Sequence, residues 1–257
     1  MNSDLQGKVA IVTGASRGIG RAIAQCLSAE GMKLVIAARS QELLDDVARG
    51  CGSEVVPVSL DLRDEQAPQQ LVEHALNRFG RLDLLVNNAG ATKRGDFLEL
   101  TEADWQDGFA LKFYCAVRAS RAAWPHLQAS KGGIVNIIGV GGRTGSAEFA
   151  IGGAVNAALM NLTKVLADRG VRDSVRVNAI NPGSIATERL QNRIRAFSTE
   201  NKISLAEAAV AMASSLGIAR FGEPDEIAHA VAFLASTNAA YCQGAIIDID
   251  GGQTRTL

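Results

Sequence analysis

The chain of 257 residues is 47% hydrophobic, which is enough apolar surface for one large α/β core. Its 26 basic and 27 acidic side chains give a formal net charge of −1, so no general electrostatic field favours nucleic acid or an anionic membrane. We therefore predict a single domain, 1–257, whose partner is a small-molecule substrate and not a nucleic acid or a membrane.

The cysteines and the N-terminal segment point to a cytoplasmic protein. Cys26, Cys51, Cys115 and Cys242 form no Cys-x-x-Cys pair and no metal-ligand cluster with the three histidines, so we expect reduced thiols and no metal site. Residues 1–8 are polar and lead directly into an apolar run, which leaves no room for a cleavable signal. The sequence contains no uninterrupted run of about 18 apolar residues, so no membrane span is predicted.

Short β-rich runs alternate with longer helical patterns along the whole chain. The predicted strands lie at 9–13, 34–38, 55–59, 82–86, 134–138, 175–179 and 245–249. Most of the intervening stretches are long enough for the crossover helix that parallel neighbours require. The pattern predicts a Rossmann-type, doubly wound, seven-stranded parallel sheet in a three-layer α/β/α fold. A loosely patterned stretch, within about 188–217, is predicted to form a mobile substrate lid.

The end of the first strand carries a glycine-rich turn. Its sequence is Thr-Gly-Ala-Ser-Arg-Gly-Ile-Gly, and an apolar helical run follows. Three glycines in this setting let the backbone approach a pyrophosphate, and the helix N-terminus presents free N–H groups to the anion. The turn therefore predicts dinucleotide binding by Gly14, Ser16, Arg17, Gly18, Ile19 and Gly20.

The second strand predicts which dinucleotide binds. Its end would lie beside the adenosine ribose, where NAD-selective proteins place a carboxylate for the 2′-hydroxyl. Here the residues are Ala37, Ala38 and Arg39. Together with Arg17, Arg39 can hold a 2′-phosphate in a charge-assisted contact, so we predict NADP rather than NAD.

In these motifs the chain resembles the short-chain dehydrogenase/reductase family, and the resemblance extends over essentially its whole length. Further markers follow in order: Asp61-Leu62, Asn87-Asn88-Ala89-Gly90, Asn181-Pro182-Gly183 with Thr187, and Asp250-Gly251-Gly252. The resemblance implies an adenine site at Asp61 and Leu62, and a dinucleotide wall at Asn88, Ala89 and Gly90. It also implies a nicotinamide site at Pro182, Gly183, Ile185 and Thr187. It further implies a homodimer or homotetramer built through helices at 102–127 and 149–168.

The same resemblance locates four catalytic positions, and all four differ from the family pattern. Gly139 stands at the serine position, Gly152 at the tyrosine position, Asn156 at the lysine position and Lys112 at the asparagine position. In the family, the tyrosine protonates the alkoxide that hydride transfer creates. Glycine donates no proton, so ordinary ketone reduction is not expected.

Neither tyrosine of the chain is expected to take over this role. Tyr114 lies roughly 200° around a regular helix from Lys112. Tyr241 precedes the last strand, where a structural role is expected.

The remaining polar groups leave two interpretations open. Lys112 and Asn156 are a reciprocal exchange that keeps an ammonium and an amide near the nicotinamide, or else Lys112 reaches solvent or pairs with a carboxylate. Glu148 lies one turn before Gly152 and supplies a carboxyl group, or else it is a solvated loop residue or a helix cap. Arg143 and Thr144 in the glycine-rich loop are further donors, unless they face water. The lid is basic, with Arg189, Arg193, Arg195 and Lys202, which suits an anionic substrate or a solvated helix face.

The glycines near the expected active site also have two explanations, and three functions remain possible. The glycines leave room for a bulky ligand, or they record the decay of an unused site. The leading hypothesis is an NADP(H)-dependent oxidoreductase with altered catalysis. The alternatives are an inactive NADP(H)-binding protein that acts as a sensor or oligomer partner, and a non-redox enzyme that uses an enlarged pocket.

Overall fold

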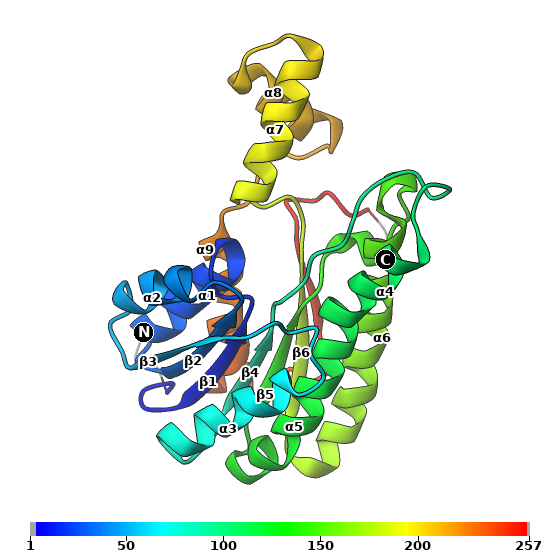
Figure 1. Cartoon of the computed structure of the whole chain (residues 1–257). Helices are drawn as coiled ribbons and strands as arrows, with labels where there is room; N and C mark the ends of the chain where they lie inside the picture. The colour runs from blue at the N-terminus through cyan, green and yellow to red at the C-terminus, as the bar shows by residue number, and fades with distance from the viewer. Residues whose placement is uncertain (1–3, 256–257) are drawn as a thin grey trace.

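The computed structural model describes residues 4–255, which form a three-layer α/β/α fold (Figure 1). Seven strands, all parallel, make one sheet in the order β3-β2-β1-β4-β5-β6-β7. The strands are β1 (Val9–Thr13), β2 (Lys33–Ala38), β3 (Val55–Ser59), β4 (Leu84–Asn87), β5 (Gly133–Ile137), β6 (Arg176–Pro182) and β7 (Ile246–Ile249). The strand order reverses between β1 and β4, so the predicted doubly wound sheet is confirmed.

Helices cover both faces of the sheet because apolar strands alternate with amphipathic helices. One face packs against α1 (Gly18–Ala29), α2 (Gln41–Arg49) and α9 (Pro224–Ala235). The other face packs against α3 (Ala67–Phe79), α5 (Cys115–Ser130) and α6 (Ala150–Asp173). The core residues Ile23 of α1, Ile227 of α9 and Leu127 of α5 are all 0% exposed. The crossover helices thus form the two outer layers.

Two strand ends differ from the sequence prediction by more than one residue. β4 begins at Leu84 rather than at residue 82, and β6 continues to Pro182 rather than ending at residue 179. The polar Asn181 and the proline suggested a loop, yet both pair with β7, Asn181 opposite Asp248 and Pro182 opposite Ile249. The longer strand carries the Asn-Pro-Gly motif to the edge of the sheet.

The predicted lid is helical rather than irregular. It consists of α7 (Glu188–Asn201) and α8 (Leu205–Ser215), which project from the rest of the fold beyond the end of β6 (Figure 1). Leu190, Ile194, Ala208 and Met212 form an apolar cluster between the two helices. The helical pattern of α7 is weak in the sequence because only this narrow stripe is buried. A covering role for the α7–α8 hairpin stays a prediction.

One helical segment, Ala147–Asp173, is long and apolar enough to cross a membrane, with a mean hydropathy of 1.3. It consists of η3 (Ala147–Phe149) and α6. Its side chains Ile151, Val155 and Leu159 are at most 2% exposed and pack within the fold. A third of its most apolar stretch is buried, and one such helix among the described residues is weak evidence of a membrane span.

Candidate functional site

The turn between β1 and α1 is so tight that only glycine fits at two of its positions. Gly14 has a φ angle of +68°, and a Cβ there would lie 2.8 Å from the Cα of Ala89. A Cβ on Gly20 would overlap the carbonyl oxygen of Gly14 and the side-chain amide of Asn88. The turn therefore has the shape that a phosphate-binding loop requires.

Hydrogen bonds fasten this turn to the end of β4. Asn88 Nδ2 donates to the carbonyl oxygens of Thr13 and Gly14, at 2.9 and 3.1 Å. Thr13 Oγ1 accepts from the backbone N–H groups of Asn88 and Ala89, both at 3.0 Å. Two residues predicted to line the dinucleotide thus also set the geometry of the turn.

The N-terminus of α1 has no side-chain cap, which leaves its first N–H groups to a ligand. Arg17, at the N-cap, instead pairs through Nη1 with Glu188 Oε2 of α7 at 2.8 Å. The predicted joint contact of Arg17 and Arg39 with a phosphate therefore requires this pair to open. Both side chains of the pair are 62% exposed, so opening it costs little. Ser16 and Ile19 lie partly buried in the same turn.

The predicted adenosine residues follow the neighbouring strands at the same edge of the sheet. Arg39 directly follows β2 and is exposed, and Ser59 Oγ donates to its carbonyl oxygen at 2.9 Å. Asp61 lies two residues after β3 and is also exposed, whereas Leu62 is 3% exposed. The carboxyl ends of β2 and β3 therefore bring these three residues to one border.

The segment after β6 packs against the glycine-rich turn. A Cβ on Gly18 would lie 3.1 Å from Cγ2 of Thr187, and a Cβ on Gly183 would lie 2.7 Å from the Cα of Asp250. Ile185, which is 6% exposed, forms a parallel bridge with Gly222. The fold thus brings 182–187, predicted to hold the nicotinamide, next to the predicted phosphate-binding turn.

Lys112 and Asn156 meet, although they belong to different helices. Lys112 Nζ donates to Asn156 Oδ1 at 2.6 Å and to the carbonyl oxygen of Ile138, just beyond β5, at 2.5 Å. A Cβ on Gly90 would lie 2.7 Å from Cδ of Lys112, so the lysine stem packs directly on that glycine. Lys112 therefore points into the predicted site, and the alternative that it reaches solvent is wrong.

Lys112 lies on a π-helical segment, not on the single regular helix expected for 102–127. The structure has α4 (Glu102–Gly108), then η1 (Phe109–Tyr114), then α5. π-helical turns are rare and frequently occur at functional sites. Tyr114 ends η1, is 49% exposed and has its ring 5.6 Å from the guanidinium carbon of Arg118. Tyr241 is fully exposed, which gives no support to the structural role expected for it, and both tyrosines lie at the surface.

Burial lowers the pKa of Lys112 from 10.5 to about 7, and the positive charge of Arg189 adds to this effect. Arg189 Nη2 donates to the carbonyl oxygen of Gly90 at 3.3 Å, so its charge is anchored beside the lysine stem. A pKa near 7 populates the ammonium and the amine together at neutral pH. This property suits a group that gives and receives a proton.

Gly139 has a backbone conformation that favours glycine, with φ +132° and ψ 142°. Its N–H donates to Asn181 Oδ1 at 3.4 Å, and Asn181 Nδ2 donates to Asp248 Oδ1 at 2.8 Å. Arg143 Nε pairs with the same Asp248 at 2.9 Å. Arg143 therefore supports this loop instead of offering an unpaired donor, and Thr144 is exposed.

The explanation that Gly152 leaves room for a ligand is wrong, because an aromatic ring occupies that space. A Cβ on Gly152 would overlap the ring of Phe149, and a Cβ on Gly141 would lie 2.8 Å from Cε1 of the same ring. Gly141 belongs to η2 (Val140–Gly142). The glycines at 141 and 152 thus accommodate Phe149, which is a packing reason for their presence. The space at Gly152 is therefore filled by Phe149 and does not enlarge a pocket.

Glu148 lies at a groove beside this ring. It is exposed in η3, and its carbonyl oxygen accepts from the N–H of Gly95 at 3.2 Å. The groove has a volume of about 510 Å³ and is lined by Arg94, Gly95, Asp96, Phe97, Ala147 and Glu148. This volume lies within the range of small-molecule sites. Glu148 is therefore at the groove, although no contact joins it to Lys112 among the described residues.

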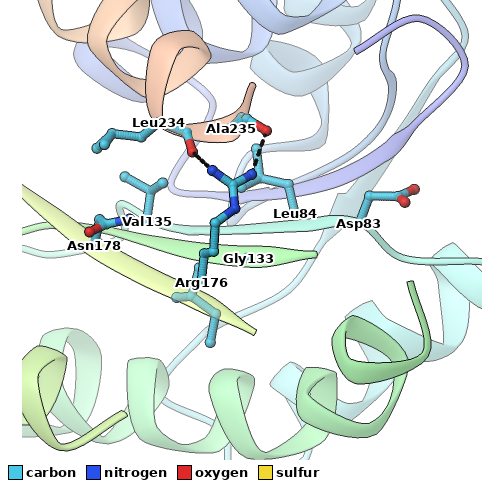
Figure 2. A pocket seen from close by; sticks show the side chains of 9 residues that line it. Asp83, Leu84, Gly133, Val135, Arg176, Asn178, Leu234 and Ala235 are labelled. Atoms are coloured by element: carbon cyan, nitrogen blue, oxygen red, sulfur yellow. Dashed lines mark hydrogen bonds between the residues drawn. The ribbon is translucent and has the colours of Figure 1, made fainter. Parts of the chain in front are cut away.

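A second cavity lies at the opposite edge of the sheet, and it is too small for a substrate. It has a volume of about 10 Å³ and lies beside Arg176 (Figure 2). Arg176 Nη1 donates to the carbonyl oxygen of Leu234, and Nη2 to that of Ala235, both at 3.0 Å (Figure 2). Arg176 thus caps the C-terminus of α9, which is a structural role.

Within the described part of the chain, no group of three or more His, Cys, Asp and Glu residues has the arrangement of a metal site. The four cysteines are free thiols. Burial raises the pKa of Cys115 to about 12, which makes it inert as a nucleophile near neutral pH.

Comparison with known proteins agrees with this geometry. A family model described as enoyl-(acyl carrier protein) reductase matches residues 14–254. The chain belongs to the short-chain dehydrogenase/reductase family of oxidoreductases. The meso-2,3-butanediol dehydrogenase of Serratia marcescens is 34% identical over 251 residues, covering 96% of this chain and 94% of that protein. A 3-oxoacyl-(acyl-carrier-protein) reductase of Thermotoga maritima is 32% identical, with 96% and 98% coverage.

The similarity extends to the three-dimensional structure. The L-sorbose reductase of Gluconobacter frateurii, solved in complex with NADPH and L-sorbose, superposes with a TM-score of 0.96 at 33% identity, and the match covers 100% of both chains. Levodione reductase superposes with a TM-score of 0.89 at 31% identity, covering 96% of this chain and 98% of that chain.

Proposed function

We propose that this protein is an NADP(H)-dependent oxidoreductase in which Lys112 replaces the tyrosine of the family as the proton donor. The observation that carries the proposal is the position of Lys112 Nζ, held between Asn156 Oδ1 and the carbonyl oxygen of Ile138. An ammonium has three donors. These two contacts use two of them, so the third remains for a substrate atom.

The turn after β1 fits a dinucleotide. Side chains are excluded at Gly14 and Gly20, and α1 begins without a side-chain cap. Gly14, Ser16, Gly18, Ile19 and Gly20 would hold the pyrophosphate through the backbone. The adenosine half would lie against Arg39, Asp61 and Leu62. The middle of the dinucleotide would lie along Asn88, Ala89 and Gly90. The nicotinamide would lie against Pro182, Gly183, Ile185 and Thr187.

NADP is favoured over NAD by the positive charge at the adenosine end. Arg39 stands where a carboxylate would repel a 2′-phosphate, and Arg17 is joined to Glu188 only by an exposed ion pair. The Gluconobacter relative, whose structure contains NADPH, has the same fold over its full length. Both observations support the same cofactor.

When bound, NADPH supplies a hydride to a substrate carbon. The substrates best suited to this site give a delocalised product anion, such as an activated alkene or a quinone-like ring; an iminium would instead give a neutral amine, which needs no proton. The Lys112 ammonium stabilises that anion and transfers a proton to it from Nζ, leaving the neutral amine. Solvent then restores the ammonium, which is feasible because the pKa of Lys112 is about 7. Asn156 keeps Nζ oriented throughout.

Stopped-flow measurement of NADPH oxidation across these substrate classes tests the proposal. We expect Lys112→Ala to retain NADPH binding and to lose activity by at least about 100-fold, since general acids typically contribute that much. Added ethylammonium should restore part of the rate, which a purely structural loss would not allow. No turnover of any of these substrates by a protein that binds NADPH would instead favour an inactive cofactor-binding protein.

A further inference from the structure

Three arginines lie close enough to act on one another electrostatically, and one of them, Arg189, also acts on Lys112; the proposed mechanism does not use them to move a proton. Arg94 comes from the loop after β4, and Arg189 and Arg193 come from α7. All three are exposed. We call them the arginine cluster.

Arg94 is held over the ring that fills the space beside Gly152. Its guanidinium carbon lies 4.3 Å from the ring centroid of Phe149. The hydrogen bond from the Gly95 N–H to the carbonyl oxygen of Glu148 fixes the loop against η3. A guanidinium stacked through its face keeps its N–H edge available, and that edge matches a carboxylate in a bidentate contact.

The two arginines of α7, Arg189 and Arg193, lie close enough to Arg94 to act on its charge. Arg189 Nη2 contacts the carbonyl oxygen of Gly90, the residue on which the Lys112 stem packs. Arg193 is four residues further on, about 40° around the helix, so it lies on the same face of α7. The buried stripe of Leu190 and Ile194, about 100° around the helix from these arginines, anchors α7 to α8.

The charges of the cluster act on one another. The pKa of Arg94 is lowered by burial and by the charges of Arg193 and Arg189, while Glu148 partly offsets the effect. Asp96 also lines the groove, and its Oδ1 accepts from the N–H of Leu98 at 2.8 Å. The three guanidinium groups thus stand against two carboxylates, those of Asp96 and Glu148, which leaves a small positive balance here although the chain as a whole is nearly neutral. Such a site attracts an anion.

We propose that the arginine cluster binds the carboxylate of the substrate, with Arg94 and Arg193 as the principal contacts. The carbon skeleton would then lie in the groove beside Phe97, toward Lys112. This inference rests on the proposed function, since it assigns a substrate class, an unsaturated organic acid, to the same site. It is tested by binding, so that its failure is distinct from a failure of hydride transfer.

The experiment measures ligand affinity for the NADP⁺-loaded full-length protein by isothermal titration calorimetry. The probes are α,β-unsaturated aromatic and aliphatic carboxylates, each paired with its methyl ester. We expect at least one acid to bind about tenfold or more tightly than its ester, as loss of a charge-assisted hydrogen bond predicts. In the Arg94→Gln/Arg193→Gln double variant this preference should disappear, while NADP⁺ affinity stays within about twofold.

Arg195→Gln is the matched control. It removes one positive charge from the same helix, but Arg195 lies about 200° around α7 from Arg193 and donates to Asn192 Oδ1 at 2.6 Å. We expect it to leave the acid preference intact. The proposal fails if no acid binds better than its ester, if the preference survives in the double variant, or if Arg195→Gln removes it equally. Loss of NADP⁺ binding in the wild type would refute the proposed function instead.

Discussion

The packing of Phe149 over Gly152 makes a quantitative prediction about stability. Replacing a helical glycine by alanine normally stabilises a protein by about 1 kcal/mol. At Gly152 the new methyl group would overlap the Phe149 ring, which also packs against Gly141. Overpacking of this kind costs about 1–3 kcal/mol. We therefore expect Gly152→Ala to lower the free energy of unfolding by about 0–2 kcal/mol, the difference between these two effects.

The neighbouring glycine supplies the control. A Cβ on Gly153 would meet only the carbonyl oxygen of Gly141, at 3.2 Å, so Gly153→Ala should be neutral or stabilising by up to about 1 kcal/mol. In a Phe149→Ala background the overlap is absent. There Gly152→Ala should stabilise by about 1 kcal/mol, which gives a coupling energy of about 1–3 kcal/mol between the two positions.

Urea unfolding followed by far-UV circular dichroism, at one fixed protein concentration, measures these differences. The two single variants and the double variant complete the cycle. If Gly152→Ala stabilised the protein equally with and without Phe149, the ring would not occupy the space that we assign to it.

Three further predictions concern the proton donor, the cofactor and the glycine turn. Lys112 has a folded-state pKa of about 7 and a reference value of 10.5, so the unfolded chain binds more protons between these pH values. In this window the free energy of unfolding of the wild type, relative to that of Lys112→Met, should rise by about 1.4 kcal/mol per pH unit. Urea unfolding at several pH values measures this difference. A difference that stays constant with pH would contradict the low pKa. Arg39→Ala should weaken NADPH binding by about 10- to 100-fold in calorimetry and leave NADH unchanged; equal losses would exclude a contact with the 2′-phosphate. Gly20→Ala should abolish NADPH binding because its Cβ overlaps Gly14 and Asn88, whereas Gly145→Ala, with open space around it, should bind normally.

The sheet could be predicted from the sequence because its signals are local. Each strand is an apolar run bounded by turn residues, and the glycine-rich turn of Gly14 and Gly20 fixes the first crossover. The pairing of Asn181 with β7 could not be predicted, since a polar residue before a proline suggests a loop. The α7–α8 hairpin was missed for a similar reason, because its sparse apolar stripe is satisfied within the hairpin itself.

The proximity of Lys112 to Asn156 was predicted only through the family resemblance, because the two residues lie 44 positions apart. The role of Phe149 was not predicted. An aromatic residue three positions before a helical glycine is the signal that was available, since side chains three apart share a helix face. The involvement of Arg94 depends on how a long loop folds back over η3, and a single sequence has no local signal for that.

The conformation of Gly139 and the ring above Gly152 also constrain how this site can change over time. A serine at 139 would sit on a strained backbone, and a tyrosine at 152 would collide with Phe149. Neither hydroxyl can be gained by one substitution without a structural penalty. Mutational paths that introduce these hydroxyls thus pass through less stable intermediates.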